Sequence, residues 1–237
     1  MRVLGILGGM SWESTAVYYR LLNQGVAQRL GGLHSAALLL HSVDFAPIAA
    51  LQAAGDWDQA AGVLSQAAQG LQRAGAQGLL LATNTMHLVA DCIEAACGLP
   101  LLHIADATGA AVQAAGLQHV ALLGTRFTME DDRIVRARLQ QRFGLVVLVP
   151  GAEDRALMHR VIYEELCRGV VRTASRDAVV AIIDGQRREG AQAVILGCTE
   201  IGLLVDAACS PLPVFDTTVL HAAAAVDWML ETEGTMR

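Results

Sequence analysis

The hydrophobic positions of this chain form short runs of valine, isoleucine and leucine, separated by longer mixed segments. Strands of a parallel sheet have this continuous apolar character when helices cover both faces, because every side chain of such a strand is buried. The pattern therefore predicts strands at residues 3–8, 36–43, 78–82, 99–104, 119–124, 145–150, 193–197 and 213–216.

The segments between these runs are rich in alanine, glutamine and arginine. In residues 57–74 and 155–168, apolar residues recur at steps of three and four, which predicts helices with one apolar face. Met86 and His87 are expected to begin the helix after the third strand. The alternation of strand and helix predicts an α/β fold.

The first half of the pattern is repeated in the second. VLGILGGM, GLLLATNTMH and LPLLHIAD are echoed by VALLGTRFTM, AVILGCTE and LPVFDTT. Gly124 lies 116 positions after Gly8, and Cys198 lies 115 positions after Thr83, so the spacing is kept. This repeat indicates an internal duplication.

The duplication predicts two pseudo-symmetric α/β domains, each with a mainly parallel sheet flanked by helices. We assign residues 1–103 and 213–237 to the N-terminal domain and residues 104–212 to the C-terminal domain. Ligands of open parallel sheets bind beyond the carboxyl ends of the strands. Residues at these ends should meet in an interdomain cleft that forms the active site. They are Met10, Ser11, Thr83, Asn84, Thr85, Thr125, Cys198, Thr199 and Glu200.

Composition excludes several classes of function. Hydrophobic residues make up 54% of the chain and charged residues 17%, which is ample material for a core. The net charge of −6 gives no reason to expect nucleic acid or an anionic membrane as a partner. All 17 basic residues are arginine. Without lysine, the chain has neither a P-loop nor an internal Schiff base to pyridoxal phosphate.

The five cysteines are odd in number and show neither CxxC spacing nor a His-Cys cluster, so we expect no metal site. This usage is typical of a reduced, cytoplasmic protein. No apolar stretch approaches the ~20 residues of a membrane-spanning helix. The run at residues 3–10 lacks a small-residue cleavage site and is interpreted as a strand.

Most cysteines in proteins are buried core residues. We keep that interpretation for the four without suitable neighbours, Cys92, Cys97, Cys167 and Cys209. Cys198 differs because it follows a strand, precedes Thr199 and Glu200, and is in register with Thr83. It is therefore the candidate for chemistry. The histidines in or beside strands are interpreted as structural, namely His34, His41 and His103.

Seven motifs span nearly the whole chain: GILGGMSWEST, HSVDF, TNTMH, HIADAT, LLGTRFTM, IYEEL and GCTEIG. In content and order they resemble the aspartate/glutamate racemase family. The resemblance implies a cofactor-independent amino-acid racemase with two pseudo-symmetric α/β domains, an active site between them, and usually a homodimer. It also implies one cysteine before Asn-Thr and another in the GCT motif, acting on opposite faces of the substrate's α-carbon.

This chain departs from that pattern, because Thr83 occupies the position of the first cysteine. The resemblance extends to a branch with Thr-Asn-Thr, and it implies that Cys198 faces the α-proton of the L-enantiomer. Our hypothesis is that Cys198 removes this proton, and that Thr83 or a water held by it reprotonates the opposite face. A hydroxyl is a poor base, so catalysis starting from the D-enantiomer should be slow.

A thiol serves as base and acid if nearby donors lower its pKa from about 8.5 toward neutrality. Without pyridoxal phosphate, hydrogen bonds to the substrate carboxylate must stabilise the carbanion. Asn84, Thr85, Thr199 and the backbone amides near Ser11 are the candidate donors.

Substrate choice is less constrained. Family members selective for acidic amino acids carry basic groups near the segments of Gln52 and Glu165, where this chain is neutral and acidic. Gln52 can bind a side-chain carboxylate or amide, and Glu165 an α-ammonium group. Both positions are equally compatible with a solvent-facing helix. Arg126 or Arg160 is a candidate for the missing positive charge. Aspartate and glutamate are favoured, and a broader range stays open.

Two other functions fit the single thiol. Related decarboxylases keep only the GCT cysteine, which protonates the carbanion left when carbon dioxide departs. A non-catalytic amino-acid binding protein would also tolerate loss of the first cysteine.

Overall fold

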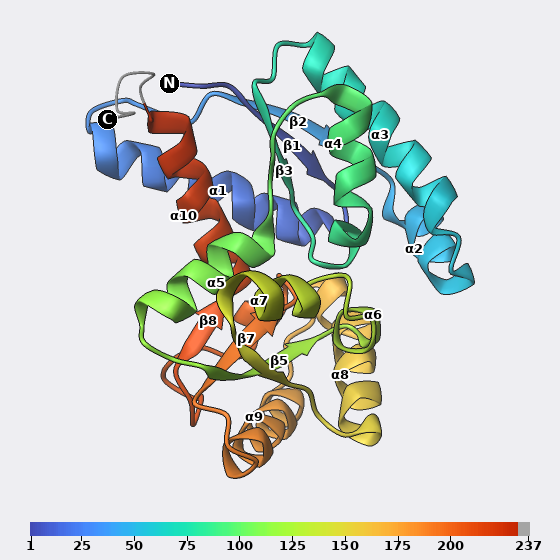
Figure 1. Cartoon of the computed structure of the whole chain (residues 1–237), viewed down its shortest axis with the longest axis vertical. Helices are drawn as coiled ribbons and strands as arrows, with labels where there is room; N and C mark the ends of the chain where they lie inside the picture. The colour runs from blue at the N-terminus through green and yellow to red at the C-terminus, as the bar shows by residue number, and fades with distance from the viewer. Residues whose placement is uncertain (232–237) are drawn as a thin grey trace. The chain divides into compact units, whose positions relative to one another are not determined.

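The computed structural model describes residues 1–231 and divides into two α/β units (Figure 1). Unit 1 comprises Met1–His103 and the chain from His221 onward, and unit 2 comprises Ile104–Leu220. Each unit contains a four-stranded sheet in which all pairings are parallel. The predicted α/β fold with two similar units is confirmed.

The sheet of unit 1 has the order β2-β1-β3-β4. Its strands are β1 (Leu4–Gly8), β2 (Leu38–Ser42), β3 (Gly78–Leu81) and β4 (Leu101–Leu102). Its helices are α1 (Trp12–Leu30), α2 (Phe45–Ala54), α3 (Trp57–Arg73), η1 (Thr85–Val89) and α4 (Ala90–Cys97). The helix α10 (Thr217–Leu230) begins in unit 2 and ends in unit 1.

The sheet of unit 2 has the equivalent order, β6-β5-β7-β8. Its strands are β5 (His119–Gly124), β6 (Val146–Leu148), β7 (Ala193–Gly197) and β8 (Val214–Asp216). Its helices are α5 (Ile104–Ala114), α6 (Arg126–Glu130), α7 (Arg136–Phe143), α8 (Ala152–Glu164), η2 (Leu166–Arg168), α9 (Thr173–Arg188) and η3 (Ile201–Leu203). The internal repeat of the sequence is thus a repeat of topology.

The structure divides at His221, eight residues after the boundary predicted at residue 213. Strand β8 pairs with β7, with Val194 opposite Val214 and Leu196 opposite Asp216. The pairing holds residues 213–220 in unit 2, and the chain returns to unit 1 at His221, inside α10.

The predicted helices differ from the structure in detail. The helix predicted at 57–74 is α3. The one predicted at 155–168 begins earlier, at Ala152, and ends at Glu164, where a short 3-10 turn replaces it. Met86 and His87 lie inside the 3-10 turn η1, and the α-helix proper begins at Ala90.

The core of unit 1 has two faces because side chains alternate along buried strands. Leu79 and Leu81 of β3 pack in a cluster with residues of α3 and α4. Leu80 and Ala82 point the other way, into a cluster with residues of α1 and α10. All four residues have no exposed surface, which explains the unbroken apolar run in the sequence.

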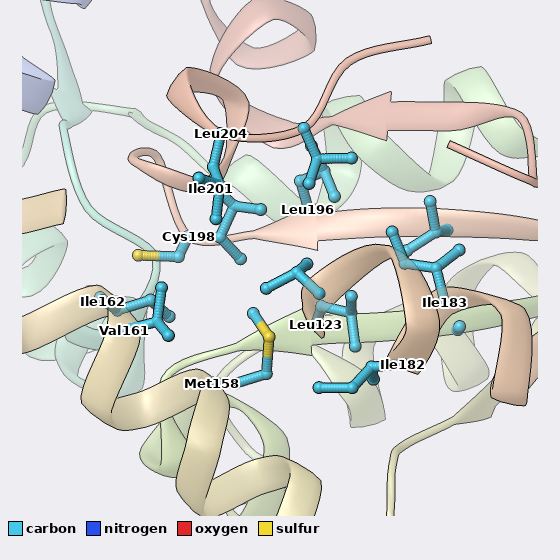
Figure 2. Packing of buried hydrophobic residues seen from close by; sticks show 14 of the residues in the cluster. Leu123, Met158, Val161, Ile162, Ile182, Ile183, Leu196, Cys198, Ile201 and Leu204 are labelled. Carbon is cyan, nitrogen blue, oxygen red and sulfur yellow. The ribbon is translucent and has the colours of Figure 1, made fainter. Parts of the chain in front are cut away.

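One face of the unit 2 sheet packs against α8 and α9. Figure 2 shows Leu123 and Leu196 facing Met158 of α8 and Ile183 of α9. On other strands of this sheet, α5 contacts β8 and α7 contacts β6. The sheet is therefore covered by α7, α8 and α9, which connect its strands in sequence as expected for βαβ units, and by α5, which precedes β5.

Glycine at position 78 is required by packing, which gives a test of the unit 1 core. A Cβ on Gly78 would lie 2.5 Å from the indole of Trp228 in α10. Arg2 holds this indole, with its guanidinium 5.0 Å from the ring and a hydrogen bond to the Trp228 carbonyl. Gly78→Ala should therefore lower the free energy of unfolding by about 1–3 kcal/mol in urea denaturation.

Gly62 is the matched control. It lies in α3, is exposed, and has open space where a Cβ would be added. Gly62→Ala should stabilise the protein by roughly 0.5–1 kcal/mol through helix propensity. Equal unfolding midpoints for the two variants would contradict the packing argument.

Candidate functional site

The residues at the end of β1 form a turn that leads directly into α1. Gly9 has φ 92°, and a Cβ there would collide with the Val43 backbone, so glycine is required. The Ser11 hydroxyl accepts from Ser14 N (3.3 Å) and caps α1. The Ser14 hydroxyl donates to Ala82 O (3.2 Å), which ties the start of α1 to the end of β3.

The polar triplet after β3 is buried. Thr83, Asn84 and Thr85 are 3–7% exposed. Thr83 N donates to Leu81 O (2.9 Å), and the Thr83 carbonyl lies 2.8 Å from His87 Nδ1. Because a carbonyl only accepts, His87 carries its proton on Nδ1. The triplet and Ser11 are therefore brought to the same edge of the unit 1 sheet.

Two buried histidines, His87 and His221, and the partly buried His103 lie next to one another in unit 1. The His87 ring is 4.5 Å from that of His103 and 5.8 Å from that of His221. His221 Nε2 donates to Leu102 O (2.8 Å), so its Nδ1 accepts from the Tyr18 hydroxyl (2.9 Å). Burial lowers the pKa of His221 to about 4. Burial, with the neighbouring histidines, also lowers the pKa of His87 well below its usual value.

Gln52 and Met10 are both buried in unit 1. Gln52 is 2% exposed, and its Nε2 lies 3.0 Å from Met86 Sδ, next to the triplet. The alternative of a solvent-facing Gln52 is therefore wrong, because α2 turns this side chain inward. Met10 is 3% exposed and packs in the apolar cluster of Leu81 and Met86.

In unit 2, the ends of β5 and β7 approach closely. Gly124 is opposite Gly197 in the sheet, and a Cβ on Gly124 would lie 2.9 Å from the Gly197 carbonyl. Thr125, directly after β5, is 6% exposed and caps α6 by accepting from Thr128 N (3.2 Å). The two glycines thus bring Thr125 and Cys198 to neighbouring strand ends.

The residues after β7 form a compact hydrogen-bonded group. Cys198 Sγ donates to Glu200 Oε2 (2.9 Å), and Thr199 Oγ1 donates to the same oxygen (2.7 Å). All three residues are 2–7% exposed. Figure 2 shows the Cys198 sulfur pointing away from Ile201 and Leu204 of its own cluster.

The electrostatics at Cys198 differ from the sequence-based expectation. Burial raises the pKa of the Cys198 thiol well above its usual value, and the Glu200 carboxylate adds to this shift. The expectation that nearby donors lower this pKa is therefore wrong, because the polar group at 2.9 Å is an acceptor. The sulfur is held as a protonated thiol.

Cys167 is a neighbour that the sequence did not reveal. Its Sγ lies 3.7 Å from Glu200 Oε1, and burial, with Glu200 beside it, raises its pKa. Burial also raises the pKa of Tyr163, one turn earlier, with Cys198, Cys167 and Glu200 contributing. The four-residue spacing of Tyr163 and Cys167 predicts that they lie on the same side of a helical segment. No pattern in the sequence indicates that both lie near Glu200.

The remaining candidates of unit 2 have partners elsewhere or lie at the surface. Glu165 accepts from Ser175 Oγ (2.7 Å) and lies 3.6 Å from a guanidinium nitrogen of Arg172. Arg126 is exposed, with its guanidinium 5.7 Å from the Phe127 ring, and Arg160 is also exposed.

Residues 1–231 contain no group of three or more histidine, cysteine, aspartate or glutamate side chains arranged to hold a metal ion. Within the same residues, no helix combines the length and apolar character needed to cross a membrane. All five cysteines are free thiols.

Comparison with known proteins agrees with this architecture. The sequence model of the Asp/Glu/Hydantoin racemase family matches residues 7–225. The structure of a candidate Asp/Glu racemase from Yersinia pestis is 54% identical in sequence, with a TM-score of 0.90 over 98% of this chain and 100% of that one. An aspartate racemase homologue from Pyrococcus horikoshii is 31% identical, with a TM-score of 0.81 over 98% and 100%.

A more distant structure shares the fold alone. The aspartate racemase of Picrophilus torridus is 19% identical, with a TM-score of 0.77 over 97% of this chain and 94% of that one.

The buried histidines predict a loss of stability in acid. Unfolded His221 titrates near 6.5 and folded His221 near 4, so between these values the unfolded chain binds more protons. This contribution is complete above pH 6.5 and is lost as the pH falls toward 4, at about 3 kcal/mol for His221. Urea denaturation between pH 4 and 7 measures it.

The variant His221→Gln keeps an amide donor for Leu102 O but does not titrate, so its stability should depend less steeply on pH. His34→Gln, at an exposed histidine, is the control and should keep the parent's slope. The same slope in the parent and in His221→Gln would show that His221 is not the titrating group.

Proposed function

Because the chain belongs to the Asp/Glu/hydantoin racemase family, we propose that it is a cofactor-independent amino-acid racemase for aspartate, glutamate or a broader set of amino acids. Enzymes of this family are isomerases, and so is this chain. The observation that carries the proposal is the buried Cys198 thiol, 2.9 Å from the Glu200 carboxylate at the carboxyl end of β7.

The first step is removal of the α-proton from the L-enantiomer. The Cys198 proton moves to Glu200 Oε2, which already accepts its hydrogen bond. The resulting thiolate takes the α-proton, so the Cα–H bond breaks, an S–H bond forms, and the electron pair stays on the substrate. The α-ammonium group of the amino acid favours this thiolate, because a nearby positive charge lowers a thiol pKa.

The second step is protonation of the opposite face by the Thr83 hydroxyl or a water molecule that it holds. The O–H bond breaks, the electron pair of the carbanion forms the new Cα–H bond, and the proton held on Glu200 returns to the oxygen through solvent when the product leaves. Topology supports this assignment, since Thr83 follows β3 as Cys198 follows β7, in sheets of equivalent strand order. A hydroxyl delivers a proton but is a poor base. Starting from the D-enantiomer, Thr83 or its water must act as the base and has to lose a proton first. This direction therefore has the lower kcat.

Hydrogen bonds to the substrate carboxylate stabilise the carbanion. Asn84, Thr85 and Thr199 are the proposed donors, together with backbone amides near Ser11. Ser11 caps the 19-residue helix α1, and a helix N-terminus favours an anion through its free amides and its dipole. Thr125, at the end of β5, is the fifth proposed substrate contact.

Recognition of the substrate side chain is assigned to the amide of Gln52, which is buried beside the triplet. A neutral amide binds a carboxylate or an amide and selects less strongly for acidic side chains than a cation. This supports a substrate range that includes aspartate and glutamate and extends beyond them. Glu165 and Glu200 are the acidic groups proposed to meet the α-ammonium group.

Racemisation should be asymmetric. The two enantiomers have equal free energy, so kcat/KM is the same in both directions, and the asymmetry lies in kcat. Initial rates and solvent-deuterium incorporation measured from each pure enantiomer should give a higher kcat from the L-enantiomer. Equal kcat values in both directions would refute the assignment of Thr83 and Cys198.

Substitutions separate the two faces. Cys198→Ala should abolish both α-deuterium incorporation and inversion. Thr83→Ala should reduce inversion by about 10²-fold, the usual size of a proton-transfer contribution, while the L-enantiomer still exchanges its α-proton. Thr83→Ser, which keeps the hydroxyl, is the matched control. Proton NMR in deuterium oxide with chiral chromatography follows both processes.

The single thiol also suits a decarboxylase of the same superfamily, in which Cys198 protonates the carbanion after carbon dioxide leaves. Release of carbon dioxide from substituted malonates, without exchange of amino-acid α-protons, would support that alternative. Ligand-induced stabilisation by amino acids without either activity would indicate a binding protein.

We further propose a homodimer in the cytoplasm. The family resemblance supports the dimer, and five free thiols fit a reducing compartment. Sedimentation equilibrium tests the assembly.

A further inference from the structure

The Glu200 carboxylate lies between two thiols that come from different parts of the chain. Cys198 Sγ donates to Oε2 at 2.9 Å, and Cys167 Sγ donates to Oε1 at 3.7 Å. Cys198 follows β7, and Cys167 lies in η2, after α8. Each carboxylate oxygen is therefore matched to one thiol.

We propose that Cys167 is a positioning residue for proton transfer at Cys198, an inference whose catalytic part rests on the proposed function. The Cys167 thiol holds Oε1 and so fixes the rotation of the Glu200 carboxylate. In that orientation Oε2 faces Cys198 Sγ and can receive its proton.

Charge balance gives Cys167 a second effect. When the Cys198 proton moves to Glu200 Oε2, the pair keeps one negative charge, which now lies on the sulfur. When the proton instead leaves for solvent at alkaline pH, a second negative charge forms beside the carboxylate. Glu200 is 2% exposed, so bulk water does little to offset this charge. The donors from Thr199 and Cys167 remain, and both stabilise the anionic pair.

Cys167 is suited to act as a permanent donor. Burial raises its pKa, and the adjacent carboxylate raises it further, so Cys167 keeps its proton through the neutral range. It is not a second base. The sequence places it in IYEELCRG, ahead of a glycine with φ 71°, which ends η2 and fixes the position of the turn.

The test measures the thiolate of Cys198 directly. The full-length protein is treated with short pulses of iodoacetamide across pH 7–11.5, because burial and Glu200 raise the Cys198 pKa. Alkylation of Cys198 is followed by peptide mass mapping, because the thiolate is the reactive form. Cys167→Ala and Cys167→Val both remove the donor, and Val also keeps the volume. Each should raise the midpoint by about one pH unit, which is tenfold in thiolate fraction.

Cys167→Ser is the rescue variant, because a hydroxyl also donates to a carboxylate. It should keep the midpoint of the parent. Cys209→Ala is the matched control, since Cys209 is a partly buried thiol packed against the same unit 2 cluster, with its hydrogen bonds to Asp206. It should leave the midpoint unchanged.

Activity gives a second readout. Cys167→Ala and Cys167→Val should lower kcat for L-amino-acid racemisation about tenfold with KM nearly unchanged, and Cys167→Ser should restore it. Unshifted alkylation midpoints in both donor-less variants, or a serine variant that behaves like alanine, would overturn the role of Cys167. Alkylation needs no turnover. If the parent protein has no racemase activity, the proposed function is refuted, but the alkylation midpoints still test the role of Cys167.

Discussion

The parallel pairing of every strand is the constraint on which the arrangement of both units depends. Parallel strands all end at the same edge of a sheet, so any residue that directly follows a strand is delivered to that edge. Ser11 and Thr83 reach the edge of one sheet in this way, and Thr125 and Cys198 reach the edge of the other. Glycines at the last strand positions keep neighbouring strand ends close.

Burial and the hydrogen bond to Glu200 act in the same direction at Cys198, because both raise the pKa of the thiol. Burial and the adjacent carboxylate keep the sulfur protonated, although a base at this position must give up its proton. The resting thiol is therefore protonated, and in the proposed mechanism its activation depends on the charge that a substrate brings. A protonated thiol is less open to side reactions of the sulfur, and the proposed proton transfer then depends on the position of Glu200.

The sequence predicted the fold better than the site. Apolar runs located every strand because fully buried strands leave a clear pattern, and the repeat indicated two similar units. The pattern did not reveal that residues 213–220 stay in unit 2. That placement depends on the pairing of β8 with β7, a tertiary contact that the apolar pattern of either strand does not specify. Cys167 was assigned to the core, and Gln52 was left open between the site and a solvent-facing position. Cys167 contacts Glu200 and Gln52 contacts Met86, and both contacts join elements that are distant in sequence.

The path of α10 has a consequence for synthesis on the ribosome. Unit 2 is continuous in sequence, whereas the Leu4 and Leu80 face of unit 1 is covered by α10 residues as far along as Met229. As a nascent chain emerges, the second unit has all its residues before the first does. Until α10 emerges, one apolar face of the first unit stays uncovered. Nascent chains that stall before α10 should therefore be the ones that bind a chaperone.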